Sequence, residues 1–180
     1  MYMIYANKPT IVAFTDGASS RKNNIMSWAY VVYIDNEEFH YDYGVKSDST
    51  NNRMEITAML QLLEFLKESE SEIIHICSDS KYLLKAISPQ FTSVQTGETE
   101  YSAYSWLDLW QKTDWISSTG TPVKNQDLWF KMIELLKTIK KHNIVKFFHT
   151  KGHIGVKGNE RADYLCQYAI KNYLKSINLS

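Results

Sequence analysis

Four acidic residues, Asp16, Glu55, Asp79 and Asp163, lie at the ends of predicted strands or helices. Two carboxylates about 4 Å apart repel by roughly 4 kcal/mol at an effective dielectric near 20, so a cluster of four needs protons or divalent cations. A set of ligands made only of oxygens favours Mg²⁺ or Mn²⁺. A pair of such ions suits displacement at a phosphodiester, because it stabilises both the attacking and the leaving oxygen.

Each of these acids has an ordinary structural explanation when it is taken alone. An acidic side chain in the first turn of a helix interacts favourably with the helix dipole and can cap backbone N–H groups. Glu55 is harder to explain in this way, because its helix carries Ile56, Met59, Leu63 and Leu66 near one face, which should pack on a core. A carboxylate close to that face is costly unless it is compensated. Metal ions would compensate it.

The elements that must position these acids form a predicted mixed sheet flanked by helices, an α/β fold. Asp16-Gly17 is a turn signal that should end the first strand, and residues 92–102 should form a polar loop. We expect five strands in the order β-β-β-α-β-α…β-α, over residues 10–16, 27–34, 37–45, 73–78 and 143–149. Helices are expected from residue 50 to about 68 and over 80–87, 103–112, 126–142 and 159–174.

In such a sheet the strand ends and helix starts converge at one edge, so the four carboxylates can meet there. The 180 residues, of which 44% are hydrophobic, are ordinary for one compact domain. No repeat or boundary is visible, and we expect a single domain over residues 1–180.

Composition restricts the class of protein. The 20 basic and 20 acidic side chains cancel, so a polyanion must be met by a local patch. The apolar runs are too short and too charged for a membrane span, and residues 1–10 lack the pattern of a secretory signal. Cys77 and Cys166 form no metal-ligand pattern and should be buried, reduced thiols. We expect a cytoplasmic protein without a membrane partner.

Five motifs, in order, resemble the type 1 ribonuclease H family: "TDGASS" at Thr15, "TNNRME" at Thr50, "SDS" at Ser78, "PVKNQDLW" at Pro122 and "KGHIGVKGNERAD" at Lys151. Single motifs occur by chance, whereas the ordered set is specific. The match covers about residues 10–168, followed by the rest of the last helix and a short tail to residue 180. The resemblance implies a ribonuclease H-like fold and a monomeric endonuclease that cuts the RNA strand of RNA–DNA hybrids with two Mg²⁺ ions, for which Mn²⁺ would substitute. The products would carry 5′-phosphate and 3′-hydroxyl ends.

The resemblance also implies which residues carry the reaction. By their places in the motifs, Asp16, Glu55, Asp79 and Asp163 resemble the metal-binding carboxylates of the family. His153 resembles its mobile histidine, which handles a proton or helps the product to leave, as suits a group that titrates near neutral pH. The other interpretation of His153 is a surface histidine that takes no part.

Contacts with the hybrid are implied in the same way. Asn51 and Asn52 match positions that contact the minor groove, where amides can read the 2′-hydroxyl, although helix capping by Asn51 explains it equally well. Lys81 stands after Ser80, where the family often has glutamine, and could contact a phosphate instead. The residues expected to contact substrate are Gly17, Lys22, Thr50, Asn51, Asn52, Ser80, Lys81, Trp106, Trp110 and Lys112.

The segment 106–115 aligns with the basic protrusion of the family but offers only Lys112 against Asp108 and Asp114. Its tryptophans, including Trp106 and Trp110, fit packing between helices better than stacking on bases, because their spacing is helical. With few cations in the protrusion, hybrid affinity should be modest and should depend weakly on salt.

Two other functions stay open. A DNA nuclease or integrase-type enzyme on the same fold would use similar carboxylates, but it would not be expected to carry "TNNRME" and "KGH" at these places. A hybrid-binding module without catalysis would gain nothing from a repulsive acidic cluster that faces a polyanion.

Overall fold

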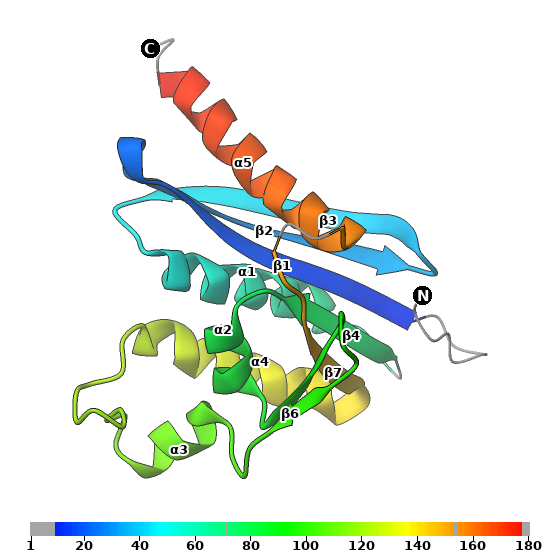
Figure 1. Cartoon of the computed structure of the whole chain (residues 1–180), viewed down its shortest axis with the longest axis vertical. Helices are drawn as coiled ribbons and strands as arrows, with labels where there is room; N and C mark the ends of the chain where they lie inside the picture. Colours follow the sequence, from blue (N-terminus) through cyan, green and yellow to red (C-terminus); the bar gives the residue numbers. More distant parts are fainter. Residues whose placement is uncertain (1–9, 71, 153–154, 178–180) are drawn as a thin grey trace.

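The sheet is the frame of the molecule. The structure, a computed structural model, describes residues 10–70, 72–152 and 155–177. Within these residues seven strands form one sheet in the order β3-β2-β1-β4-β7-β5-β6 (Figure 1). Strands β1 (Thr10–Ser20), β2 (Ile25–Ile34) and β3 (Glu37–Ser47) are antiparallel, whereas β4 (Ile73–Ser78) and β7 (Ile144–His149) run parallel to β1. The predicted mixed α/β sheet is confirmed.

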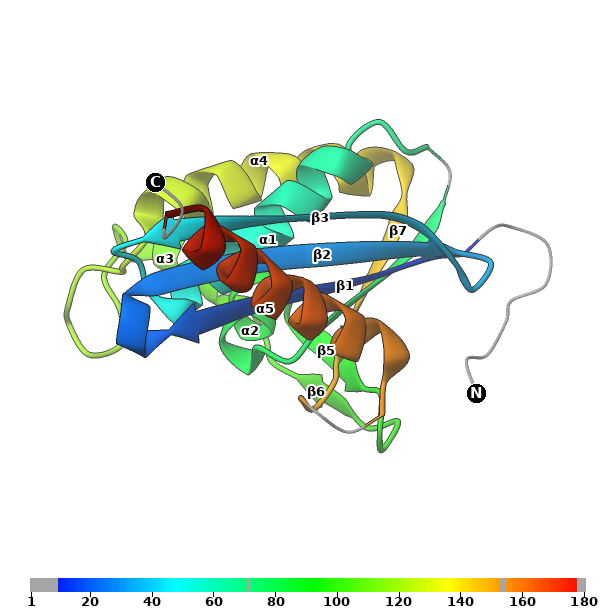
Figure 2. The same cartoon turned by 90° about the horizontal axis from the view of Figure 1, so that it is seen from above.

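Helices cover both faces of this sheet. In Figures 1 and 2, α5 crosses one face over β1, β2 and β3, while α1 and α4 lie on the other face. The short helices α2 and α3 pack against each other on the same side as α4. The helices of the described chain are α1 (Asn51–Leu66), α2 (Lys81–Ile87), α3 (Trp106–Lys112), α4 (Gln126–His142) and α5 (Lys157–Ile177).

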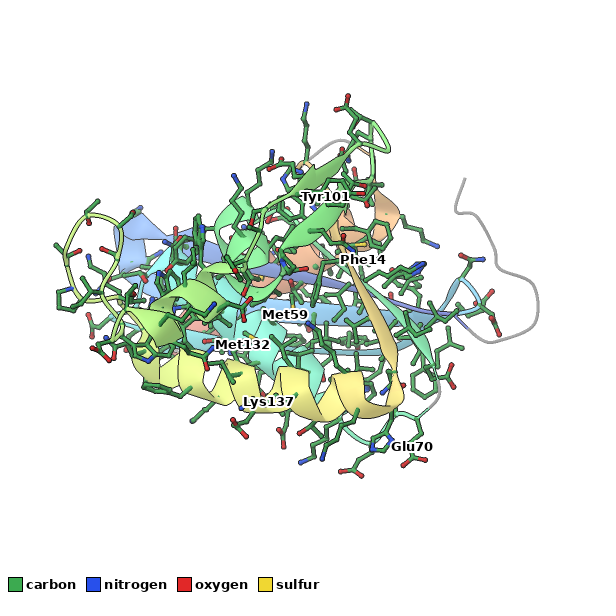
Figure 3. The ribbon with its side chains drawn as sticks, turned by 90° about the horizontal axis from the view of Figure 1, so that it is seen from below. Phe14, Met59, Glu70, Tyr101, Met132 and Lys137 are labelled. Carbon is green, nitrogen blue, oxygen red and sulfur yellow. The ribbon has the colours of Figure 1, made fainter. Side chains whose placement is uncertain are left out.

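Two hydrophobic cores lie on the two faces. Successive side chains of a strand point to opposite faces, so Ala13 joins the core beneath α1 and α4, whereas Phe14 packs against α5. Met59 of α1 and Met132 of α4 are buried in the first core, while Lys137 is on the outer side of α4 (Figure 3). The four apolar residues predicted on one face of α1 are all buried, which confirms the orientation of that helix.

The expected end of the first strand at Asp16-Gly17 is wrong. Strand β1 continues to Ser20, because Asp16 and Gly17 pair in register with Ala29 and Trp28 of β2. The chain instead turns at the short 3-10 helix η1 (Arg21–Asn23) and Asn24, whose φ of 50° is left-handed. Gly17 instead allows β1 to pack closely against α1.

The predicted count of five strands and the polar loop over 92–102 are also wrong. Strands β5 (Gln90–Ser93) and β6 (Thr99–Tyr101) form a hairpin that adds to the edge of β7, where Thr92 and Ser93 pair with Phe148 and His149. The hydroxyls of Thr92 and Thr99 are 2.9 Å apart across the hairpin. Strands of three and four residues are too short and too polar to give an alternation signal.

The cysteines and the polarity of the helices are the last features of the fold. Cys77 and Cys166 are buried free thiols, as predicted. Every helix in the described part of the chain is too short or too polar to cross a membrane.

Candidate active site

The parallel pairing of β1 and β4 brings Asp16 beside Asp79. Thr15 is the register partner of Ser78, and the residue that follows each of them is an aspartate. Asp79 follows the last residue of β4 and precedes Ser80, the N-cap of α2. The two carboxylates therefore come from neighbouring strands at the same level of the sheet.

Glu55 reaches the same place from α1. The helix begins after Thr50, whose side chain accepts a hydrogen bond from the backbone N–H of Arg53, and Glu55 lies in the second turn. The first turn carries no acidic residue, so dipole stabilisation does not explain Glu55. The side chain of Asn51 donates a 3.4 Å hydrogen bond to Oε1 of Glu55, while Oε2 is buried without a hydrogen-bond partner in the described structure.

Asp16, Glu55 and Asp79 form an acidic cluster, the one group of three possible metal ligands among the described residues. One carboxylate oxygen of each lies within 4.8 Å of the others. Asp16 is 7% exposed and Glu55 is 4% exposed, so neither charge is well solvated. Asp79 is half-buried. Three close acidic oxygens, two of them on buried residues, are a donor set that suits a hard divalent cation.

The pKa values of Asp16 and Glu55 are raised, as expected for close carboxylates that no cation neutralises. Burial is the main cause that raises the pKa of Asp16 to about 8, with the negative charges of Asp79 and Asp163 adding to it. Burial also raises the pKa of Glu55 well above its usual range, and Asp16 and Asp79 raise it further. In the absence of cations, the cluster therefore retains protons near neutral pH.

Asp163 lies close to the cluster but outside the group of three. It is half-buried in the second turn of α5, and its charge contributes to the raised pKa of Asp16. Gln167, one turn further along α5, donates a 3.5 Å hydrogen bond to Asp163. The structure thus brings all four predicted acids to one region, with three of them in direct reach of a common ion.

His153, the predicted mobile histidine, lies outside the described residues. The neighbouring Gly152 is described, and a Cβ atom there would be 3.2 Å from Oδ2 of Asp79. The chain at Gly152, shortly after β7, therefore passes beside the acidic cluster.

Among the residues predicted to contact substrate, Asn51 at the start of α1 is next to the acidic cluster, because it donates to Glu55. Thr50, Asn51 and Asn52 are exposed at the first turn, and Lys22 is exposed on η1. The suggested helix capping by Asn51 is wrong, because Thr50 is the N-cap and the Asn51 side chain turns to Glu55 instead.

Ser80 and Lys81 have intramolecular partners. The hydroxyl of Ser80 caps α2 by accepting from the backbone N–H of Leu83 at 3.3 Å. The ammonium of Lys81 donates to Glu100 on β6.

The predicted aromatic contacts, Trp106 and Trp110, lie in a cluster of rings. Their ring centroids are 6.0 Å apart, and Trp110 is 5.7 Å from the buried ring of Trp129 on α4. Both are half-buried and pack on the first core. The Lys112 ammonium lies 4.1 Å from the centre of the exposed Tyr104 ring.

Sequence reasoning missed a contact that holds the loop beside the cluster. The Gln95 side chain, at the tip of the β5–β6 hairpin, donates to the Thr150 hydroxyl at 3.1 Å and accepts from the backbone N–H of Lys151 at 3.3 Å. The only sequence signal for this hairpin is Gly97, because a short loop with glycine is typical of a hairpin connection.

It also missed a link between α1 and α4. The Arg53 guanidinium donates to Oδ1 of Asp127 at 3.0 Å and to the side-chain oxygen of Asn125 at 3.1 Å. Both partners lie in the "PVKNQDLW" motif, which is thereby joined to the helix that carries Glu55.

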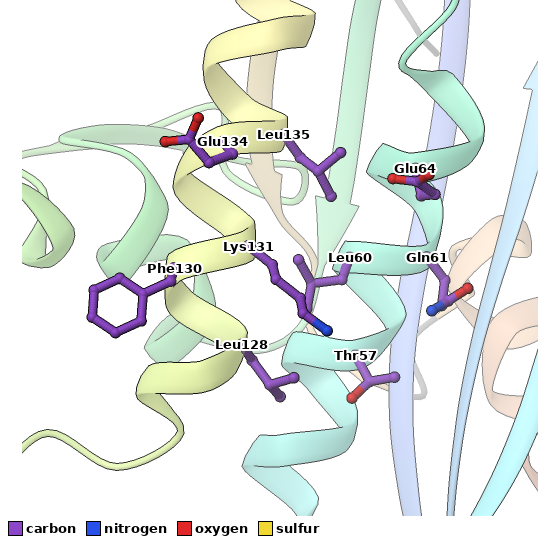
Figure 4. Close-up of a pocket in the computed structure, with 9 residues that line it drawn as sticks. All are labelled: Thr57, Leu60, Gln61, Glu64, Leu128, Phe130, Lys131, Glu134 and Leu135. Carbon is purple, nitrogen blue, oxygen red and sulfur yellow. The ribbon is translucent and has the colours of Figure 1, made fainter.

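A groove of about 610 Å³ between α1 and α4 is separate from these residues (Figure 4). Leu128 and Lys131 point from α4 toward α1 at this groove, whereas Phe130 points away. Apolar and polar side chains both line it, and none of them belongs to the acidic cluster.

Comparison with known proteins gives consistent results. A family model described as RNase H matches residues 8–171. A protein named ribonuclease H from Prosthecochloris aestuarii is 37% identical over 164 residues, which cover 90% of this chain and 96% of that protein.

Solved structures share the fold. The foamy viral protease-reverse transcriptase in complex with dsDNA matches with a TM-score of 0.67 at 17% identity, over 94% of this chain and 97% of the other. LC11-RNase H1 in complex with RNA/DNA hybrid matches with a TM-score of 0.55 at 19% identity, over 92% of this chain and 99% of the other. Strand order and helix placement are thus those of known folds.

Proposed function

The chain belongs to the ribonuclease H family, and we propose that it hydrolyses the RNA strand of RNA–DNA hybrids with divalent metal ions held by Asp16, Glu55, Asp79 and Asp163. The observation that carries this proposal is the buried acidic cluster, in which Oε2 of Glu55 is without a hydrogen-bond partner among the described residues. A buried carboxylate oxygen without a partner is costly, and a cation would satisfy it. The residues present therefore fit a metal.

We propose two Mg²⁺ ions, with Mn²⁺ as a substitute, because the four side chains offer only oxygen ligands. When bound, such ions would polarise the phosphodiester and favour the attack of water, leaving 5′-phosphate and 3′-hydroxyl ends. The oxygen-only donor set supports the choice of Mg²⁺, and the resemblance to the family supports the number of ions.

The residues of the chain have distinct tasks in this proposal. The pairing of Thr15 with Ser78 positions the backbones of Asp16 and Asp79, which follow them, on neighbouring strands. The hydrogen bond from Asn51 orients the Glu55 carboxylate. His153 would move a proton or assist product release, as its place in the motif suggests.

The hybrid would be recognised by residues around the cluster. Asn51, Asn52 and Ser80 offer amide or hydroxyl groups that can read a 2′-hydroxyl in the minor groove. In this proposal Thr50, Lys22 and Lys112 contact phosphates of the two strands. Gly17, Lys81, Trp106 and Trp110 complete the proposed contact set, in which the tryptophans serve mainly by packing.

We also propose that the protein acts as a monomer in the cytoplasm. Its two thiols are free and buried, which suits a reducing compartment. Light scattering on the purified protein measures the oligomeric state directly.

The test of function is cleavage of labelled substrates. RNA–DNA hybrid, double-stranded DNA and double-stranded RNA of the same sequence are each incubated with the protein in Mg²⁺ or in EDTA. We expect cleavage of the RNA strand of the hybrid, in Mg²⁺ only. Cleavage of DNA would favour the related DNA nuclease, and hybrid binding without cleavage would favour a binding module.

A further inference from the structure

One carboxylate of the β5–β6 hairpin is paired with two lysines at the rim of the site. The Lys81 ammonium donates to Oε1 of Glu100, and Nζ of Lys85 lies 3.6 Å from Oε2. The lysines are four residues apart on α2, so they share one side of that helix. The three side chains are between 44% and 50% exposed, so a ligand can reach all of them.

This ion-pair group is close to the acidic cluster. Lys81 follows Asp79 by two residues. Burial lowers the pKa of His149, the charge of Lys81 lowers it further, and Asp79 and Glu100 oppose these effects. All three charges therefore act on one ring at the end of β7, beside the proposed metal ligands.

The hairpin holds Glu100 firmly in this position. Glu100 is paired in register with Phe91, and the backbone N–H of Val94 donates to the carbonyl of His149 at 2.9 Å. Gln95 adds two hydrogen bonds to the segment that follows β7. Because the strand is already ordered, only side-chain entropy is lost when Glu100 meets the lysines.

We infer that Glu100 occupies the cations that would otherwise bind a phosphate of the hybrid, and that it thereby limits hybrid affinity. The inference rests on the proposed function. A carboxylate and a phosphate make the same charge-assisted hydrogen bonds to an ammonium group. A hybrid must displace Glu100 from Lys81 and Lys85, and the displaced carboxylate then repels the backbone. An exposed ion pair is weak enough for this exchange.

The experiment measures binding of a fluorescein-labelled RNA–DNA hybrid by anisotropy in EDTA, at several salt concentrations. Glu100→Gln removes the charge and keeps the shape of the side chain. We expect it to bind hybrid about twofold to fivefold more tightly than the parent at low salt. Its affinity should also fall more steeply with salt, because each new phosphate contact adds about 0.9 to the slope.

Glu98→Gln is the matched control. Glu98 is exposed on the same hairpin and bonds to Thr96 rather than to a lysine, so this variant makes the same change in net charge. A second comparison sets Glu100→Gln against the parent when Lys81 and Lys85 are both glutamine. The gain from Glu100→Gln should disappear there.

The outcomes separate this inference from the proposed function. If Glu100→Gln and Glu98→Gln bind alike, or if the gain survives without the lysines, Glu100 does not compete with phosphate. If the parent cuts hybrid in Mg²⁺ but Glu100→Gln gains no affinity beyond that of Glu98→Gln, only the inference fails. If the parent neither cuts nor binds hybrid, both fail. A thermal melt of each variant verifies that the hairpin substitutions leave the fold intact.

Discussion

The backbones of Gly17 and Glu55 are in such close contact that a Cβ atom on Gly17 would lie 2.7 Å from the amide nitrogen of Glu55. It would also lie 3.0 Å from the carbonyl carbon of Met54. This contact places the strand of Asp16 directly against the helix of Glu55. The separation of the two carboxylates therefore depends on the absence of a side chain at residue 17.

Gly17→Ala should push α1 away from β1. We expect it to lower the free energy of unfolding by about 1 to 3 kcal/mol, as overpacking does, and to lower the rate of hybrid cleavage more than tenfold. Urea denaturation and a cleavage assay measure the two effects. Ser19→Ala, at an exposed position on the same strand, should change neither. A Gly17→Ala protein with parent stability and rate would show that the contact is not needed.

Glu55→Gln should abolish cleavage while the fold is kept, because the amide has the same shape and binds a cation poorly. Hybrid cleavage in Mg²⁺ and a far-ultraviolet circular dichroism melt are the measurements. Glu64→Gln is the control, since Glu64 is exposed on the same helix and pairs with Lys67. Cleavage by Glu55→Gln at the parent rate would exclude Glu55 as a metal ligand.

Without divalent cations the folded protein should lose stability as pH rises from about 4 to about 8. The pKa of Asp16 is raised from its ordinary value of 3.8 to about 8, so the folded state keeps a proton that the unfolded state releases. Its contribution to stability is therefore complete below the lower value and disappears through the higher one. The slope for one such group is about 1.4 kcal/mol per pH unit.

Urea denaturation in EDTA at several pH values tests this. Asp16→Asn, which cannot ionise, should have a flatter pH profile than the parent, and added Mg²⁺ should restore parent stability at pH 8. An identical pH profile for the parent and Asp16→Asn would contradict the assignment.

Gln95→Leu should lower kcat about threefold to tenfold and leave KM nearly unchanged, because Gln95 positions Thr150 and Lys151 without being expected to touch the hybrid. Steady-state kinetics on hybrid separate the two constants. Gln95→Glu keeps the acceptor for the Lys151 N–H and should recover part of kcat. Gln90→Leu, at an exposed site on the same hairpin, is the control. A change in KM alone would indicate direct substrate contact.

Hybrid affinity should depend weakly on salt. The segment 106–115 offers only Lys112, which rests on the Tyr104 ring, and Glu100 occupies Lys81 and Lys85. We expect a slope of log affinity against log salt no steeper than about −3, which corresponds to few phosphate contacts. Anisotropy titrations over a range of salt measure it. A slope near about −6 would mean that other cations bind the backbone.

Much of the fold could be predicted from local patterns. The strand at 73–78 and the helix at 126–142 have the predicted bounds, because a buried strand is a short apolar run and an amphipathic helix repeats at 3.6 residues. The end of β1 was mispredicted, because a glycine after an aspartate indicates a turn unless another element packs closely on it.

The amino-acid sequence by itself determined the four acids, the motifs around them and the order of most elements. These are local properties, since a motif is contiguous and periodicity is a feature of neighbouring residues. Only the tertiary structure decided that Asp16, Glu55 and Asp79 share one buried cluster, that Gln95 holds Thr150 and that Glu100 pairs with Lys81. Those contacts join residues that are distant along the chain, and they exist only because strand pairing and helix packing bring their backbones together.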